Sequence, residues 1–136
     1  MTGFTLVPSE FFSTEASHKI LSEVVPLQDT DIVRHIELPK YKAVLVYVQK
    51  SDDESATEPP IVDLLRFAPT ISGHNRLAVS LNNNYIYIVL AEGEKLLLAN
   101  AYPAADVVTA EYFIFASLRE FQINPRMTTI HFHGEV

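Results

Sequence analysis

The stretch from Arg76 to Tyr102 constrains the fold most, because three apolar runs lie there with only two short polar breaks between them. The runs are RLAVSL, YIYIVLA and KLLLANAY, and β-branched and aromatic residues of this kind favour strands. The first break, residues 82–84, is three asparagines, which tolerate positive φ, and the second, residues 92–94, has a glycine at its centre. The pattern predicts a meander of three antiparallel strands joined by tight turns.

A long helix and a last strand are predicted to follow the meander. Residues 104–122 carry apolar side chains at helical spacing, which we assign to one broad face lying across the sheet. That face consists of Val107, Val108, Ala110, Phe113, Ile114, Leu118 and Phe121. Asn124-Pro125 ends the helix, and Met127 to His133 is predicted as a strand. A right-handed crossover through the helix would let this strand lie parallel to the first strand of the meander.

The first third of the chain predicts the order strand, helix, strand, strand. The strands are residues 4–7, 32–38 and 43–49, of which the last, AVLVYVQ, is the central one. In the helix, residues 11–25, one apolar face is assigned to Ala16, Ile20, Leu21 and Val24, with Ser9 or Ser13 as the N-cap. Residues 50–60, KSDDESATEPP, are interpreted as an exposed acidic connector, and a short helix follows them.

The sequence therefore predicts an α/β (strictly α+β) fold in three parts. Residues 1–50 form the strand–helix–strand–strand module, residues 51–75 the acidic loop and short helix, and residues 76–136 the meander–helix–strand subdomain. The chain has 136 residues and 48% hydrophobic residues, enough for a packed core.

Composition excludes several kinds of function. The formal net charge of −7 disfavours nucleic acid and anionic membranes as partners. The absence of cysteine excludes disulfides, thiolate nucleophiles and cysteine-ligated metal sites. No signal peptide and no apolar run long enough to span a membrane is present, so we expect a cytoplasmic protein.

His131 and His133 are candidate metal ligands, because side chains two apart on a strand share a face. Zinc needs about three or four protein ligands, however, and neither an HExxH pattern nor a neighbouring carboxylate on the same face completes the set. We therefore interpret both as polar side chains on the solvated face of a half-buried strand, with Ile130 and Phe132 facing the core.

His74 and Asn100 are candidate ligand-facing residues. His74 could pair with Ser72 or Ser80 and with Asp63 in a catalytic triad, but no GxSxG turn accompanies it, so a loop histidine is the favoured interpretation. Asn100 closes the run KLLLAN, where its side chain is expected to cap backbone groups. The carboxylates at residues 52–54 lie in the acidic connector, whereas catalytic carboxylates need a rigid setting.

Tyr85 and Tyr87 form the candidate interaction surface. They alternate with Ile86 and Ile88, so the two tyrosines share one face of their strand. Tyrosine is better suited than isoleucine to contact water. We therefore predict that the tyrosine face is exposed and binds a partner.

Several stretches resemble an uncharacterised bacterial family of domain-of-unknown-function proteins (DUF3822) with an actin-like ATPase fold. They are FTLVPSEFF, the region from Phe67 to His74, KLLLANAYPAADVVTAEYFIF and INPRMTTIHFHGEV. The resemblance implies a ribonuclease-H or actin-like half-domain within a two-lobed protein about twice this length. On that basis we expect this chain to correspond to an interior portion of the family.

The resemblance does not bring a phosphate site with it. The four glycines are isolated, and no DxG, GxGxxG or GxxxxGK[ST] motif is present, so we expect no ATP hydrolysis and no cofactor. The favoured function is a non-catalytic interaction or scaffold domain that binds a protein partner or itself, as in a homodimer. The alternatives are a remnant nucleotide-binding module of an actin-like ATPase and a small hydrolase or metal-binding protein.

Overall fold

A computed structural model describes residues 3–49 and 59–133. The chain divides into two compact units, Met1–Pro59 and Pro60–Val136. The helices are α1 (Ser17–Ser22), α2 (Pro60–Phe67) and α3 (Val107–Glu120), and the strands are β1 (Phe4–Pro8), β2 (Ile32–Leu38), β3 (Ala43–Gln49), β4 (Asn75–Asn82), β5 (Tyr85–Glu92), β6 (Lys95–Pro103) and β7 (Thr129–Phe132). Single turns of 3-10 helix are η1 (Ser9–Phe11), η2 (Pro39–Tyr41), η3 (Ala68–Thr70) and η4 (Pro125–Met127).

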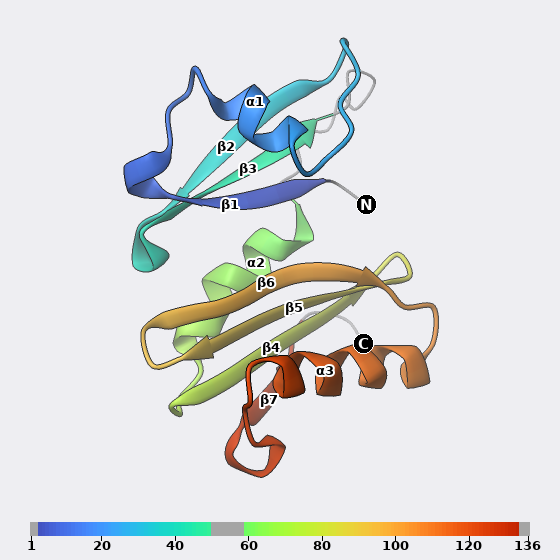
Figure 1. The fold of residues 1–136 in the computed structure, drawn as a ribbon. Coiled ribbons are helices and arrows are strands. Elements are labelled where there is room, and N and C mark those ends of the chain that lie inside the picture. The colour runs from blue at the N-terminus through green and yellow to red at the C-terminus, as the bar shows by residue number, and fades with distance from the viewer. Residues whose placement is uncertain (1–2, 50–58, 134–136) are drawn as a thin grey trace. The chain divides into compact units, whose positions relative to one another are not determined.

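The first unit is an antiparallel sheet in the order β1-β3-β2, with α1 packed on one face (Figure 1). The central position of β3 is the one that the sequence predicted. Alternate side chains of β3, at Val44, Val46 and Val48, pack with Leu21 of α1 because the side-chain period of a strand is two. The strand–helix–strand–strand order is thus confirmed.

Helix α1 is shorter than predicted. It begins after a turn in which the Ser13 hydroxyl accepts a hydrogen bond from the Ala16 amide at 3.2 Å, and it ends at Ser22. Leu21 is fully buried, but Val24 is 61% exposed. The predicted apolar face is therefore wrong for Val24, because the helix ends before that residue and no longer fixes its direction.

The second unit is a four-stranded sheet in the order β6-β5-β4-β7. The two hairpins are antiparallel and β7 pairs with β4 in parallel, as the sequence predicted. Asn83 and Asn84 have φ of 49° and 64°, and Gly93 has φ of 60°. These left-handed conformations give the two-residue turns the twist that a hairpin needs.

Helix α3 covers one face of this sheet and α2 contacts β4, β5 and β6 on the other (Figure 1). The core below α3 joins Ile114 and Leu118 to side chains such as Ile88 from the sheet. The rings of Tyr102 and Phe113 stack with their centroids 4.5 Å apart, which fixes the helix against β6. Within residues 3–49 and 59–133, no helix is both long and apolar enough to span a bilayer.

Both ends of α3 are capped by side-chain or backbone hydrogen bonds. The Asp106 carboxylate accepts a hydrogen bond from the Thr109 amide at 2.7 Å. At the other end Gln122, with φ of 56°, lets the amide of Ile123 donate to the carbonyl of Leu118 at 2.8 Å. This is a Schellman motif without glycine, a signal that the sequence pattern did not contain.

The broad apolar face predicted for α3 is wrong at its first turn. Val107 is 67% exposed and Val108 is 77% exposed, whereas Ala110, Ile114 and Leu118 are buried against the sheet.

The short helix α2 also differs from the predicted grouping, because its contacts with β4, β5 and β6 make it part of the second unit. The acidic stretch 50–58 lies outside the described residues.

Candidate functional site

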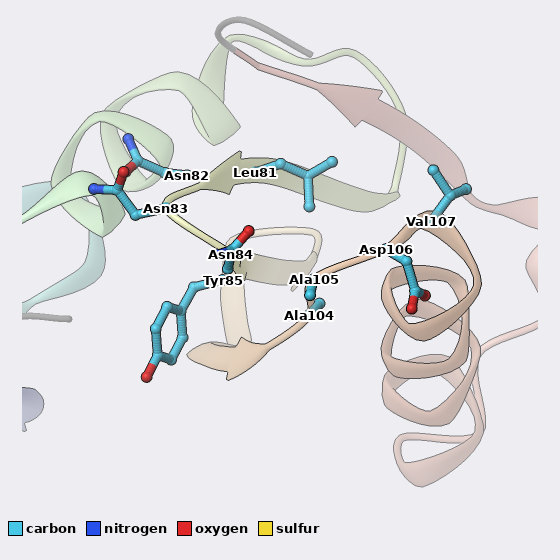
Figure 2. A pocket seen from close by; sticks show the side chains of 9 residues that line it. All are labelled: Leu81, Asn82, Asn83, Asn84, Tyr85, Ala104, Ala105, Asp106 and Val107. Atoms are coloured by element: carbon cyan, nitrogen blue, oxygen red, sulfur yellow. The ribbon is translucent and has the colours of Figure 1, made fainter.

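A pocket of about 300 Å³ lies in the second unit, between the β4–β5 turn and the start of α3. Figure 2 shows the Asn82 and Asn83 amides at one end of it and Asp106 at the other. Its lining residues are Leu81, Asn82, Asn83, Asn84, Tyr85, Ala104, Ala105, Asp106 and Val107. The Asn84 carbonyl accepts a hydrogen bond from the Ala104 amide at 2.8 Å, which holds the two segments together. The volume is at the lower limit for small-molecule sites.

The charge in this pocket is negative. A hydrogen bond from the Thr109 amide lowers the pKa of Asp106, so the carboxylate is ionised near neutral pH. It therefore occupies the end of α3 where free amides and a positive dipole would otherwise attract a phosphate. None of the nine lining residues is lysine or arginine. The pocket accordingly suits a neutral or cationic group better than a nucleotide phosphate.

Tyr87 does not lie on an exposed face. It is 3% exposed, and burial raises the pKa of its hydroxyl, with a smaller contribution from Tyr85. Strand β5 is buried on both faces, because α2 contacts it on one side and the core below α3 on the other, so alternation alone could not indicate which face contacts water. The predicted exposed tyrosine face is therefore wrong for Tyr87. Tyr85 is half-buried beside the turn and lines the pocket, and its contact with a partner stays a prediction.

His131 and His133 both lie against Phe67 at the end of α2. The His133 ring stacks on Phe67 with centroids 4.3 Å apart, and the His131 ring meets it edge-on at 6.4 Å. The two histidines thus share one side of the sheet, but each is half-buried under an aromatic ring instead of solvated. Ile130 packs on the core below α3, whereas Phe132, which was expected to do the same, is 53% exposed.

Metal ligands do not gather around these histidines in the part of the chain that the structure describes. Among residues 3–49 and 59–133, no three His, Asp or Glu side chains lie close enough to hold an ion.

His74 is exposed in the loop before β4, where its carbonyl accepts a hydrogen bond from the Gly93 amide at 2.7 Å. A Cβ added to Gly93 would lie 3.3 Å from the His74 ring, so the two residues are in contact.

Asn100 lies within β6 and does not end it, because the strand continues to Pro103. Its side-chain oxygen accepts a hydrogen bond from the amide of Ala101 at 2.9 Å, and the residue is exposed. The side chain therefore binds local backbone, as expected, although at a position inside the strand. It does not line the pocket.

The outer face of α3 carries the largest group of exposed apolar side chains on one element of the second unit. We define the outer face of α3 as Val108, Glu111, Tyr112, Phe115 and Arg119. These residues lie on one side of the helix because a turn has 3.6 residues. Val108, Tyr112 and Phe115 are 77%, 64% and 48% exposed. Sequence reasoning missed this face, although the spacing of residues 108, 112 and 115 was the signal that could have revealed it.

Comparison with known proteins places the chain in a family. The model of the family described as "Protein of unknown function (DUF3822)" matches residues 1–136. The chain belongs to this family. No curated protein matches it.

A solved structure shares the fold. It is the crystal structure, at 1.85 Å resolution, of a Bacteroides thetaiotaomicron VPI-5482 protein with an actin-like ATPase fold and unknown function, and it superposes with a TM-score of 0.81 at 17% sequence identity. The match covers 100% of this chain and 58% of that chain. The mixed α/β fold is thus that of the actin-like ATPases, as the resemblance implied, and this chain spans little more than half the length of its structural neighbour.

Proposed function

We propose that this member of DUF3822 is a non-catalytic protein-interaction domain that associates with a second copy of itself and acts as a scaffold. The observation that carries the proposal is the outer face of α3, where three large apolar side chains are exposed on consecutive turns. Contiguous exposed apolar surface on a folded domain commonly marks a place where another protein binds.

The energy available from this face predicts a weak complex. Full burial of a Val, Tyr or Phe side chain contributes roughly 1.5–3 kcal/mol, and a symmetric pair would bury six of them. Because these side chains are already partly covered, the gain is on the order of 7–10 kcal/mol. Association itself costs about 4–15 kcal/mol. The largest gain set against the smallest cost leaves about 6 kcal/mol, so we expect a dissociation constant of tens of micromolar or weaker.

The nucleotide-binding alternative gains little from the pocket beside α3. A phosphate would have to approach the ionised carboxylate of Asp106, and the helix amide of Thr109 is already occupied. The fold alone does not imply the activity of the proteins that share it.

The test is the molar mass of the purified, tag-free chain, measured by sedimentation equilibrium from about 1 µM to about 1 mM. The expected result is a rise with concentration from 15.3 kDa towards twice that value. A mass that stays at 15.3 kDa over the whole range would refute self-association.

A further inference from the structure

We infer that the outer face of α3 is the dimer contact itself, and that two copies of α3 pack antiparallel across a two-fold axis at Phe115. This inference rests on the proposed function and specifies its geometry. It depends on where the two charged residues of the face lie relative to its apolar residues.

Glu111 and Arg119 lie at equal distances on either side of Phe115 along the helix, four residues before it and four after it. Both are exposed and both share the face with Phe115. When two identical helices cross antiparallel at Phe115, the position four residues before this centre meets the position four residues after it in the other copy. Each Glu111 then faces Arg119 of the second copy, and the symmetric dimer contains this opposite-charge contact twice.

The same residues exclude the parallel arrangement. In a parallel pair Glu111 would face Glu111 and Arg119 would face Arg119, and like charges placed together across an interface are costly. The antiparallel arrangement also sets the two helix dipoles in opposite directions, which is the favourable orientation for neighbouring helices. The charge order along α3 therefore selects one of the two ways of pairing it.

Charge also favours a second copy over an oppositely charged partner. The whole chain has a net charge of −7, which would repel another copy through most surfaces. The outer face of α3 is different, because its single acidic residue and its single basic residue cancel. The outer face of α3 is thus a neutral, self-complementary surface on an acidic molecule. Val108, Tyr112 and Phe115 supply its apolar contact.

The apolar and charged residues have separate roles in this contact. Helices that pack in this way lie about 8–10 Å apart, close enough to bury the central aromatic rings. Exposed ion pairs contribute little to affinity, whereas they do set register and orientation. Reversal of one charge is more disruptive than its loss, because it creates two like-charge contacts in each dimer.

The experiment uses two charge reversals, Glu111→Arg and Arg119→Glu, each in the full chain. Each variant alone should self-associate at least tenfold more weakly than the wild type, as measured by sedimentation equilibrium. An equimolar mixture of the two should recover the dimer, because both contacts between unlike variants then join an arginine to a glutamate. The double variant E111R/R119E should also dimerise like the wild type.

The control is Glu120→Arg, which makes the same charge change on the same helix but points away from the outer face. It should leave the dimer unchanged, and circular dichroism should show that all four variants are folded. A wild-type dimer that neither single reversal weakens would overturn the α3 contact and leave self-association standing. Single variants that weaken the dimer but do not recover on mixing would overturn the antiparallel register. A wild-type chain that is monomeric at every concentration would refute both proposals.

Discussion

Which side of α3 faces the sheet can be tested by one pair of substitutions, Leu118→Ala and Val108→Ala. Leu118 is 1% exposed in the core between α3 and the sheet, and Val108 is 77% exposed on the outer face. Removal of a buried leucine leaves a cavity and typically costs 2–5 kcal/mol, so we expect about 3 kcal/mol here. Removal of the exposed valine should cost less than about 0.5 kcal/mol, or slightly stabilise the helix, because alanine has the higher helix propensity.

The assay is urea unfolding followed by far-ultraviolet circular dichroism at a few micromolar protein, where association contributes little. With a slope of about 2 kcal/mol per molar urea, Leu118→Ala should lower the midpoint by about 1.5 M and Val108→Ala should move it by less than about 0.3 M. If the slope of the unfolding free energy against urea concentration is the same in both variants and the wild type, the shifts in midpoint report changes in stability alone. Equal losses for the two variants would contradict the reasoning, because they would mean that both side chains contact the sheet.

Two further predictions concern the ends of secondary structure elements. Asp106 has a lowered pKa in the folded state, so its ionised carboxylate stabilises the protein above the unfolded value of 3.8 and this contribution is lost as the pH falls through the folded pKa. The stability difference between the wild type and Asp106→Asn, which keeps a capping side chain, should therefore shrink in thermal melts as the pH falls through 3.8 and below, and a constant difference would contradict the assignment. Gly93 has φ of 60°, so Gly93→Ala should lower the free energy of unfolding by about 1–2 kcal/mol in urea titrations. Gly93→Asn should cost less, because asparagine tolerates this conformation. Equal losses of stability for the two variants would point instead to a clash with the His74 ring.

The sheets could be predicted from the sequence because local signals agreed with one another there. The strand β3 has the predicted bounds, Ala43–Gln49, since a run of β-branched residues is closed by polar ones on either side. The meander followed from asparagines at positive φ and from Gly93, and the parallel position of β7 followed from the handedness of crossovers. For the strands and the hairpin turns, the residues that decide the structure are neighbours in the chain, whereas the β4–β7 pairing joins distant segments and followed only from the general handedness rule.

The direction of side chains was harder to predict. Helix α3 carries apolar residues on both sides, so periodicity could not separate Ile114, which is buried, from Phe115, which is half exposed. Tyr87 shared a face with Tyr85 as predicted, yet alternation says nothing about a second helix that covers that face. The pocket was missed because it joins two segments about twenty residues apart, the turn at Asn83 and the cap at Asp106.

The parallel contact between β4 and β7 has a consequence for the order in which the second unit forms and opens. Its first pair, Arg76 with Thr129, closes a loop of about fifty residues, whereas each hairpin closes over a two-residue turn. The longer closure costs more chain entropy and is supported by a strand of only four residues. We therefore expect β7 to join last and detach first, so that its amides exchange with deuterium while those between β4 and β5 are still protected.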